Sequence, residues 1–439
     1  MAFHELAQKY GPIMTMYFGS VRVVQVSSTK LVKQALVAQG KEFNARAEPF
    51  VFNDPNLSDG FIFAQGDEWQ SSRRWLVKGM RDVGLGKNQM VMKINDEVEH
   101  LIALIDSKQG EMLEPLNSFI EPVCSIICGI ITSHPYDPKN PQMKRAFDSI
   151  CAFMKQSNLS NFIHFCFPML SHVSSSPNGK KVAEAYDAFI EMIVPIIEAR
   201  RKDFVKNSGE PVRDLIDLYL ETEDTDQGID VRKFSRAMAE LFAAGQDTSI
   251  KTLAWLLLFV TMNPEIQKRC QREIDAVIDT DRMPQPSDRQ KLVYIEAVIN
   301  ETSRLAGVAG IGALHSNWDI HRQIEGYDIP PYTAVVYNSH ALHRDADYWD
   351  NPKEFRPERW LDGDGKLVNH GDHYMPFGAG PRFCLGEQLA KAEMFHFTVA
   401  LLQRFDFKLE TQINDFDDGD FGFTNEPPSF KVSVKRRVL

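Results

Sequence analysis

The chain has 439 residues, of which 43% are hydrophobic and 25% are charged, and this composition is typical of a globular protein. The formal net charge of −11, with no basic domain, excludes a nucleic-acid-binding surface. The 6 cysteines are scattered without a CxxC pair, which indicates a reducing compartment. No stretch approaches the roughly 18 apolar residues that a membrane-spanning helix needs.

The first part of the chain is predicted to begin with a β-hairpin and then to become helical. Residues 14–27 combine β-branched and aromatic residues around Gly19-Ser20, which indicates two strands and a turn. Residues 45–66 are rich in Pro, Asn, Asp and Gly, so we expect a long functional loop there. The helices expected in this part cover residues 29–39, 69–80 and 89–104.

The middle of the chain is predicted to be helical and to contain one long buried helix. Helix follows helix over residues 116–207. Asp230 then precedes a long run, residues 231–261, whose second half is apolar nearly all round. Such a helix has to be covered on every side, so we expect it at the centre of the protein. Asn263-Pro264 ends it and caps the next helix.

The last part is predicted to mix helix, strand and irregular chain. The expected segments are a helix over 289–304, strands within 313–340, irregular chain over 344–376, a helix from 387 onward and final strands within 421–439. No internal repeat, low-complexity tract or flexible linker interrupts this order. We therefore interpret residues 1–439 as one mainly α domain with a small β-rich side.

A single cysteine, Cys384, lies in a glycine-rich turn at the start of the predicted helix after it. The exposed amide groups and the dipole of that helix are expected to lower the pKa of the thiol. Gly378, Gly380 and Gly386 permit backbone angles or close approach, and Arg382 adds a positive charge. The pattern predicts a socket for a thiolate ligand that faces a flat anionic group. The alternative is an ordinary buried free cysteine beside a turn.

The segment resembles the haem-binding signature of the cytochrome P-450 superfamily. The fixed places of that signature are filled by Phe377, Gly380, Arg382, Cys384 and Gly386. The resemblance implies that Cys384 is the proximal iron ligand of haem b, iron protoporphyrin IX, and that its thiolate favours O–O cleavage. It also implies a cofactor-binding loop that includes Phe377, Gly378, Arg382 and Gly386.

The run Ala244-Gly245-Gln246-Asp247-Thr248 interrupts the long predicted helix. Glycine costs about 1 kcal/mol there relative to alanine, so something is expected to pack against the bare backbone. A threonine beside an acid needs water or substrate, unless it simply bonds its own i−4 carbonyl. The run is similar to the family's oxygen-binding groove. The resemblance implies that Ala244 and Gly245 contact the haem, that Thr248 holds a water chain and that Asp247 relays protons.

Glu301 and Arg304 lie three residues apart on one predicted helix face, which alone is a weak signal. Together with Arg359 they resemble the family's ExxR motif and its partner arginine. The resemblance implies a buried structural network that braces the cysteine turn. Breaking one member of such a network costs about 3–5 kcal/mol, which is enough to lose haem.

Trp69 and Arg73 lie four residues apart on another predicted helix, and alone they suggest a stacked surface pair. In the family, the WxxxR pair contacts a haem propionate. At His315 the sequence departs from the family, because Gly310 and Leu314 replace prolines that usually flank this position. The side chains expected to neutralise the two haem carboxylates are Arg46, Trp69, Arg73, His315 and Arg382.

The resemblance covers nearly the whole chain and is strongest to the animal microsomal branch that handles drugs, steroids and fatty acids. It implies a monooxygenase that inserts one atom of O2 into a lipophilic small molecule, with electrons from NADPH through NADPH-cytochrome P-450 reductase. We expect a location on the cytoplasmic face of the endoplasmic reticulum membrane. Members of this branch begin with a membrane-anchoring helix that is not in this sequence, so we interpret the chain as truncated or as an incomplete gene model.

Two alternatives stay open. One is a haem-thiolate isomerase or dehydratase that needs no external electrons, which the intact Asp247-Thr248 pair argues against. The other is a non-enzymatic haem- or ligand-binding protein. A basic cluster is expected either to dock the acidic reductase or to be a solvated helix face: Arg73, Arg74, Lys78, Arg81 and Lys87. The residues expected to face substrate are Phe50, Phe63, Ala243, Leu305, Val308, Ala309 and Phe423.

Overall fold

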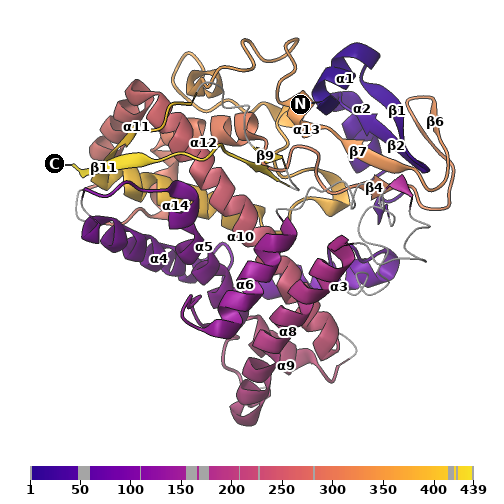
Figure 1. Ribbon diagram of the computed structural model, residues 1–439, viewed down its shortest axis with the longest axis horizontal. Helices are drawn as coiled ribbons and strands as arrows, with labels where there is room; N and C mark the ends of the chain where they lie inside the picture. Colours follow the sequence, from indigo (N-terminus) through magenta and orange to yellow (C-terminus); the bar gives the residue numbers. More distant parts are fainter. Residues whose placement is uncertain are drawn as a thin grey trace.

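Helices form most of the protein, and the largest sheet lies at one edge, on the right in Figure 1. The mainly α fold with a small β-rich side is therefore confirmed. The computed structural model describes residues 2–47, 60–108, 110–154, 166–167, 177–206, 208–225, 228–279, 282–413, 420–421 and 424–437.

The sheet at this edge has five strands in the order β1-β2-β7-β4-β3. The first two strands form the hairpin expected from the sequence, and β2 runs parallel to β7. The short pair β3–β4 places Arg46 opposite His315, so the sheet itself brings together two of the predicted haem-binding residues. The strands are β1 (Ile13–Phe18), β2 (Val21–Val26), β3 (Ala45–Arg46), β4 (His315–Ser316) and β7 (Ala334–Tyr337).

Three two-stranded sheets complete the strands of the described residues. They pair β5 (Arg322–Ile324) with β6 (Tyr327–Ile329), β8 (Phe405–Leu409) with β11 (Val432–Arg436), and β9 (Asp420–Phe421) with β10 (Asn425–Glu426). The β9–β10 pair lies between β8 and β11 in the sequence. The final strands were expected from the sequence, but β8 was not. Its residues follow a long helix directly, with no turn residue to mark the change.

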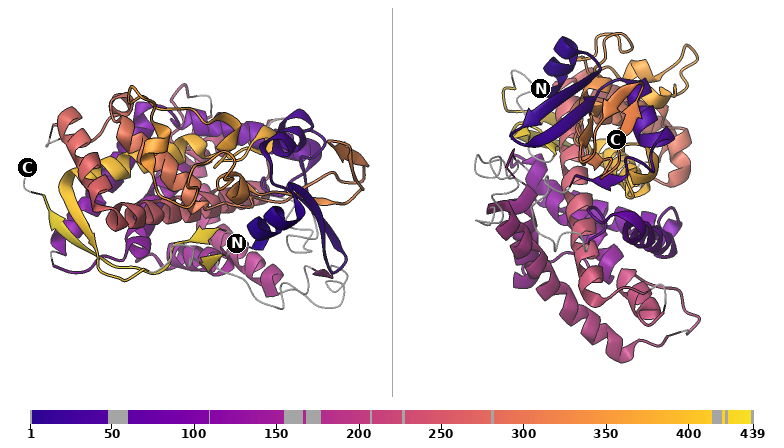
Figure 2. Two further views of the ribbon diagram at one scale, coloured as in Figure 1. Left: turned by 90° about the horizontal axis from the view of Figure 1, so that it is seen from above. Right: turned by 90° about the vertical axis from the view of Figure 1, so that its right-hand side faces the viewer.

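The helical body fills the rest of the molecule (Figures 1 and 2). Its helices are α1 (Ala2–Tyr10), α2 (Thr29–Lys33), α3 (Gly66–Asp82), α4 (Asn88–Ser107), α5 (Pro115–Thr132), α6 (Pro141–Met154), α8 (Pro177–Asp203), α9 (Leu215–Thr222), α10 (Val231–Met262), α11 (Pro264–Val277), α12 (Val293–Ala306), α13 (Ser339–Leu342) and α14 (Glu387–Arg404). Short 3-10 or π turns are η1 (Gln34–Ala38), η5 (Pro286–Gln290), η6 (Pro357–Trp360), η7 (Gly371–His373) and η8 (Gly380–Arg382).

The long helix α10 runs through the centre, as its sequence predicts. The Asp230 side chain accepts hydrogen bonds from the backbone N–H groups of Arg232 and Lys233 and so caps its first turn. α5, α8, α12 and α14 pack around it. Helix α12, which follows α11, starts at Val293 and not at residue 289. Residues 286–290 form the separate turn η5, whose Asp288 side chain accepts a hydrogen bond from the N–H of Gln285 at the start of that turn.

Among the described residues α5 is long and apolar enough to cross a membrane, by length and composition. The expectation that no stretch reaches this length was therefore too strict. However, 67% of α5 is buried inside the protein, where it packs against α4 and α10. This burial is that of a core helix.

Candidate active site

A cavity of about 360 Å³ lies between α10 and the turn that carries Cys384. Its volume is within the range of roughly 300–1,000 Å³ that is usual for small-molecule and cofactor sites. The wall comes from distant parts of the chain: β3, α3, α5, α10, the segment after α12, β4, residues 376–386 and α14. Most side chains on it are apolar.

The Cys384 turn has a fixed backbone that only glycine allows at two positions. Gly378 and Gly380 have φ of +74° and +73°. A Cβ at Gly380 would lie 1.7 Å from the carbonyl oxygen of Leu36, so the turn sits directly against η1. The N–H of Cys384 closes the turn with a 2.9 Å hydrogen bond to the carbonyl oxygen of Phe377.

The Cys384 side chain is exposed toward the cavity, just before α14 begins. Burial by the surrounding wall raises the pKa of its thiol above the ordinary value. The N–H groups of Gly386 and Glu387 and the charge of Arg73 act in the opposite direction, as expected from the sequence, but they do not overcome burial. The expected lowering of the pKa is therefore wrong for the free thiol. A coordinated metal ion reverses this balance, because it deprotonates a coordinating thiol.

Two arginines converge beside this thiol. The Nε of Arg46 and the Nη1 of Arg382 lie 3.1 and 3.3 Å from the carbonyl oxygen of Ile62. The guanidinium of Arg382 also lies 4.0 Å above the centre of the Trp69 ring. Arg73 does not stack on Trp69; it lies over the Phe383 ring, at 4.8 Å, and donates to the Phe383 carbonyl at 2.8 Å. These four residues, which were predicted to bind the haem carboxylates, therefore meet on one cavity wall.

The positive charges on this wall repel one another. Burial is the main cause of a lowered pKa for both arginines, and with the charge of Arg73 included the pKa falls to about 10 for Arg46 and, with Arg46 also contributing, to about 8 for Arg382. Their hydrogen bonds within the described chain go to neutral carbonyl oxygens, which do not compensate the charge. A ligand with carboxylates would compensate this charge, so the wall fits the propionates of haem.

His315 lines the same wall, but burial, together with the neighbouring charge of Arg46, lowers its pKa to about 3. Its Nδ1 lies 2.9 Å from the carbonyl oxygen of Phe43. Because a carbonyl oxygen only accepts, Nδ1 carries the proton of a neutral ring. The structure thus places His315 where the sequence predicted it, but the expected positive charge is absent from this ring.

In the part of the chain that the structure describes, no group of three His, Cys, Asp or Glu side chains could hold a metal ion. A metal at Cys384 would therefore need further ligands from outside the chain. A porphyrin supplies them, and its two carboxylates would meet the arginines. The single thiol, the cationic wall and the glycine turn together fit haem.

The oxygen-binding run divides between two faces of α10. Ala244, Gly245 and Thr248 line the cavity. The Thr248 hydroxyl donates to the Ala244 carbonyl at 2.9 Å, which is the i−4 bond considered from the sequence. A Cβ at Gly245 would lie 2.8 Å from Cδ1 of Ile127, so the expected close packing against bare backbone is present.

Asp247 is turned away from this cavity. Its Oδ1 lies 2.9 Å from the Nζ of Lys251, and its Oδ2 accepts a hydrogen bond from the hydroxyl of Thr424. The sequence predicted a carboxylate that relays protons beside Thr248. The structure instead puts it in a buried ion pair, because one residue along a helix is a rotation of about 100°.

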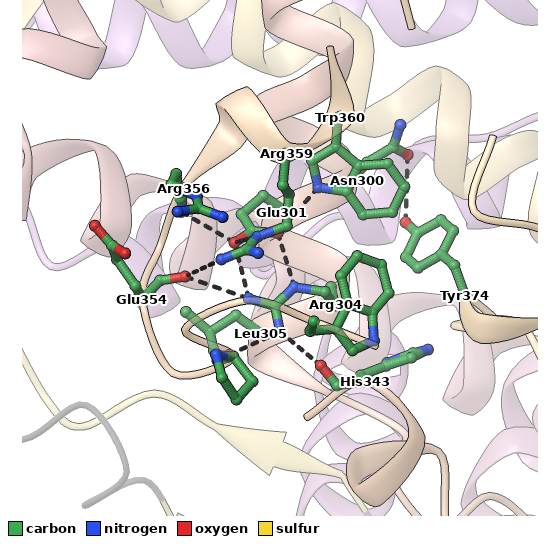
Figure 3. A network of polar contacts seen from close by, with 12 residues as sticks. Asn300, Glu301, Arg304, Leu305, His343, Glu354, Arg356, Arg359, Trp360 and Tyr374 are labelled. Atoms are coloured by element: carbon green, nitrogen blue, oxygen red, sulfur yellow. Dashed lines mark hydrogen bonds and ion pairs between the residues drawn. The ribbon is translucent and has the colours of Figure 1, made fainter. Parts of the chain in front are cut away.

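Glu301, Arg304 and Arg359 form the network expected from the sequence (Figure 3). Arg304 binds both oxygens of Glu301, each at 2.8 Å, and the Nε of Arg359 lies 2.9 Å from Oε1. Trp360 donates to Oε2 at 2.9 Å. Burial alone would raise the pKa of the Glu301 carboxyl, but the bonds and charges of both arginines outweigh it and hold the pKa below its usual value.

This network reaches the cysteine turn through His343. Arg304 donates to the His343 carbonyl at 2.6 Å, and the ring Nε2 of His343 accepts from the N–H of Met375 at 3.0 Å. Met375 in turn accepts from the N–H of Gly378 at 3.2 Å. The path joins α12 to the backbone of the turn that holds Cys384.

The predicted substrate-facing residues are placed unevenly. Val308 and Ala309 line the cavity. Phe63, Ala243 and Leu305 do not: Ala243 precedes the cavity-facing Ala244 by one helical step, and Leu305 is covered by the core. Contact of these three residues with substrate stays a prediction. Phe50 and Phe423 lie outside the described residues.

Two buried glutamates at the site were missed. Glu240 of α10 accepts hydrogen bonds from the N–H groups of Phe61 and Ile62, both at 2.7 Å, and from the Tyr186 hydroxyl at 2.9 Å. Burial raises the pKa of Glu240 to about 7. It therefore ties the cavity wall at 61–62 to α8. In the sequence, the signal that could have revealed Glu240 was its position as a single acid in an apolar helical stretch.

The other missed acid is Glu393 of α14, which lines the cavity together with Ser249 of α10. Its position in the apolar stretch that follows Cys384 was again the only signal. Apolar wall residues such as Ile127 and Ile130 of α5 carry no signal in the sequence, because nothing distinguishes them from core residues.

A family model described as Cytochrome P450 matches residues 1–434. Similar proteins are cytochrome P450 2K1 of Oncorhynchus mykiss, 32% identical over 99% of this chain and 87% of that protein, and cytochrome P450 2B2 of Rattus norvegicus, 31% identical over 99% and 89%. Cytochrome P450 2D3 of Rattus norvegicus is 30% identical over 99% and 88%.

These matches establish the general activity and do not support the two alternatives considered above. The protein is a monooxygenase of lipophilic small molecules that uses haem b and O2 and takes electrons from NADPH through NADPH-cytochrome P450 reductase. Its location is the endoplasmic reticulum membrane. The chain belongs to the cytochrome P450 family.

Proposed function

We propose that residues 1–439 act as one catalytic domain in which Cys384 ligates the haem iron and Arg46, Arg73 and Arg382 bind the haem carboxylates. The observation that carries this proposal is that a thiol and a cluster of cations face the same cavity. The wall is built from both ends of the chain, from Arg46 to Met394, which supports a single domain. When bound, haem activates dioxygen, so that one atom enters the substrate and the other leaves as water.

Thr248 is the proposed proton-handling group at the cavity. Its hydroxyl proton is donated to the Ala244 carbonyl, which leaves the oxygen lone pairs as acceptors for water. A water held there would lie in the cavity that both Thr248 and Gly245 line. The role of Thr248 is thus to orient a water molecule on the cavity wall.

The substrate is held mainly by apolar contact, because most of the wall consists of aliphatic and aromatic side chains such as Phe61, Ile127, Leu241 and Val308. Such a wall removes apolar surface from water but offers few groups for hydrogen bonds. We therefore propose that a lipophilic molecule is oriented by shape, with Val308 and Ala309 next to the reacting position.

The cytoplasmic face of the membrane is the proposed location of the domain. None of the 6 cysteines forms a disulfide, which suits the reducing cytoplasmic side. A groove beside the cysteine turn, lined by Arg74, Lys78 and Arg81 of α3 and by Pro381, is the proposed docking surface for the reductase.

The decisive experiment loads the chain with haem and records the reduced carbon monoxide spectrum. We expect the band typical of thiolate-bound haem, its loss in Cys384→Ala and its retention in the matched variant Cys151→Ala. Turnover with NADPH and reductase then has to give product only when substrate is present. A spectrum in Cys384→Ala like that of the intact chain would refute the assignment of the iron ligand.

A further inference from the structure

Two stripes of side chains run along α10, and they face different parts of the protein. Ala244, Thr248 and Thr252 line the cavity, each four residues from the next. Asp247, Lys251 and Trp255 form a second stripe with the same spacing. Since successive residues differ by about 100° around a helix, the second stripe faces about a quarter turn away from the first. It faces residues 424–426.

Asp247 and Lys251 are buried together, at 8% and 6% exposure. Each oxygen of the Asp247 carboxylate has a partner: Oδ1 lies 2.9 Å from the Nζ of Lys251, and Oδ2 accepts from the Thr424 hydroxyl. Lys251 also donates to the Thr424 oxygen at 2.7 Å and lies 3.6 Å from Oε2 of Glu426. The side chains of Asp247, Lys251 and Thr424 thus close a ring of polar contacts between α10 and the segment that begins at Thr424.

The next residue connects this ring to the cavity wall. The carbonyl of Asn425 accepts from the Trp255 indole at 3.2 Å, so the third member of the stripe also holds the segment. The backbone N–H of Asn425 donates to the Val308 carbonyl at 2.8 Å, and its side chain donates to the Ala306 carbonyl at 2.7 Å. Residues 424–426 are therefore bound on one side by α10 and on the other by the chain that carries Val308 and Ala309.

Both oxygens of the Asp247 carboxylate are occupied, by Lys251 and by Thr424. Without Lys251 the buried carboxylate loses its cationic partner, and without Asp247 the buried ammonium keeps the longer contact to Glu426 at 3.6 Å. In either case the charge that remains is poorly compensated, and the segment would shift to solvate it.

We propose that Asp247 and Lys251 are positioning residues, which together hold residues 424–426 against α10 and so set the cavity wall at Val308 and Ala309. The effect on the reaction, though not the positioning itself, rests on the proposed haem monooxygenase function.

A double-mutant cycle separates positioning from proton relay. The variants are Asp247→Asn, Lys251→Met and the double variant, studied as the haem-loaded protein. For a positioning pair, each single variant leaves a buried group without its partner, while the double variant removes both. We expect each single variant to weaken binding of a lipophilic ligand about tenfold, equivalent to ~1.4 kcal/mol, and to raise peroxide release. We expect the double variant to return to within about twofold of the unmodified protein.

A second readout does not depend on turnover or haem. Hydrogen exchange of peptides covering 306–309 and 424–426 should speed up in both single variants and slow again in the double variant. The matched control is the exposed pair Glu265 and Lys268 of α11, 2.9 Å apart, whose Glu265→Gln, Lys268→Met cycle should leave both peptides unchanged. If haem does not bind, the proposed function fails, but the exchange cycle still tests the positioning.

The results that would overturn the proposal are distinct. A relay predicts that Asp247→Asn and the double variant release peroxide equally while Lys251→Met behaves as the unmodified protein. Unchanged exchange at 424–426 in both single variants would also overturn it. If Lys251→Met does not fold, Thr424→Val tests the same link without leaving a buried charge, and it has to speed exchange at 306–309 for the proposal to stand.

Discussion

The Ser249 hydroxyl donates a 2.6 Å hydrogen bond to Oε2 of Glu393, and this bond joins α10 to α14 at the cavity wall. The other oxygen of Glu393 has no hydrogen-bond partner among the described residues, and the side chain is buried. Burial raises the pKa of Glu393 to about 8, with Ser249 only partly opposing the shift. Glu393 is thus a neutral acid at neutral pH, which distinguishes it from the ion-paired Glu301 and Asp247.

This raised pKa predicts how the stability depends on pH. The folded protein keeps the Glu393 proton up to about pH 8, whereas an unfolded chain releases it near its ordinary value of 4.5. The favourable contribution of this group is complete below about pH 4.5 and is lost as the pH rises toward 8, by up to about 1.4 kcal/mol for each unit. Glu393→Gln should remove this slope, so its free energy of unfolding should exceed that of the unmodified protein by an amount that grows with pH.

Urea unfolding of both proteins at several values from about pH 5 to pH 8 measures this difference. Infrared spectra should also lose one protonated-carboxyl band in the variant. Glu265→Gln, at an exposed acid, is the control and should leave the slope unchanged. A difference between Glu393→Gln and the unmodified protein that stays constant over this range would contradict the buried neutral acid.

Glu301→Gln should destabilise the protein strongly. The amide keeps the size of the carboxylate but leaves the buried charges of Arg304 and Arg359 without an anion. We expect a loss of about 3–5 kcal/mol and release of haem, because the network braces the chain that leads to Cys384.

The measurements are the free energy of unfolding and the rate of haem transfer to an acceptor protein. A matched acid with the same spacing to its partner is Glu265, three residues before Lys268, and its change to Gln should cost no more than about 1 kcal/mol, since this pair is exposed. Equal losses in the two variants would show that the Glu301 network does not support the cysteine turn.

Much of the fold was predictable because local signals and burial agree along α10. Asp230 caps the helix, and an apolar stretch without a polar face has to be buried, so both its start and its central place follow from the residues. The start of α12 did not follow, because a helical periodicity continues across η5 although the hydrogen bonds do not. β8 was missed because no turn residue precedes it.

The candidate site was predictable where one residue and its neighbours in sequence decide the outcome, as at Cys384 and in the pair of Glu301 and Arg304. The orientation of Asp247 was not, because its partner Thr424 lies 177 residues away and either face of α10 is compatible with the sequence. The neutral state of His315 was also hidden, since it depends on burial and on the charge of Arg46 in the adjacent strand.

Thr248→Ala should divert electrons from product to hydrogen peroxide. The hydroxyl is the proposed holder of water at the cavity, and its loss leaves the wall apolar beside Gly245. We expect NADPH consumption to continue while the product formed per NADPH falls several-fold, with little change in ligand affinity.

Peroxide and product are measured together in the reconstituted system. Thr261→Ala is the control, because Thr261 also donates to its i−4 carbonyl, Leu257, at 2.8 Å but lies in the core. It should leave the ratio of product to NADPH unchanged. An unchanged ratio in Thr248→Ala as well would remove Thr248 from proton handling.

Charge reversal on α3 should slow the delivery of electrons. Arg74 and Lys78 are exposed, and they line the groove beside Pro381 of the cysteine turn. If the reductase docks there, its association is accelerated by opposite charge, and the rate falls as salt screens the attraction. Arg74→Glu with Lys78→Glu should lower reductase-supported turnover about tenfold or more at low salt and should flatten its salt dependence.

Turnover supported by added peroxide bypasses the reductase and should not change in this double variant. Lys435→Glu, an exposed lysine on β11 at the other side of the molecule in Figure 1, is the single-site control and should retain the salt dependence. A double variant with unaltered turnover and salt dependence would place the reductase elsewhere, and the α3 cations would then be a solvated helix face.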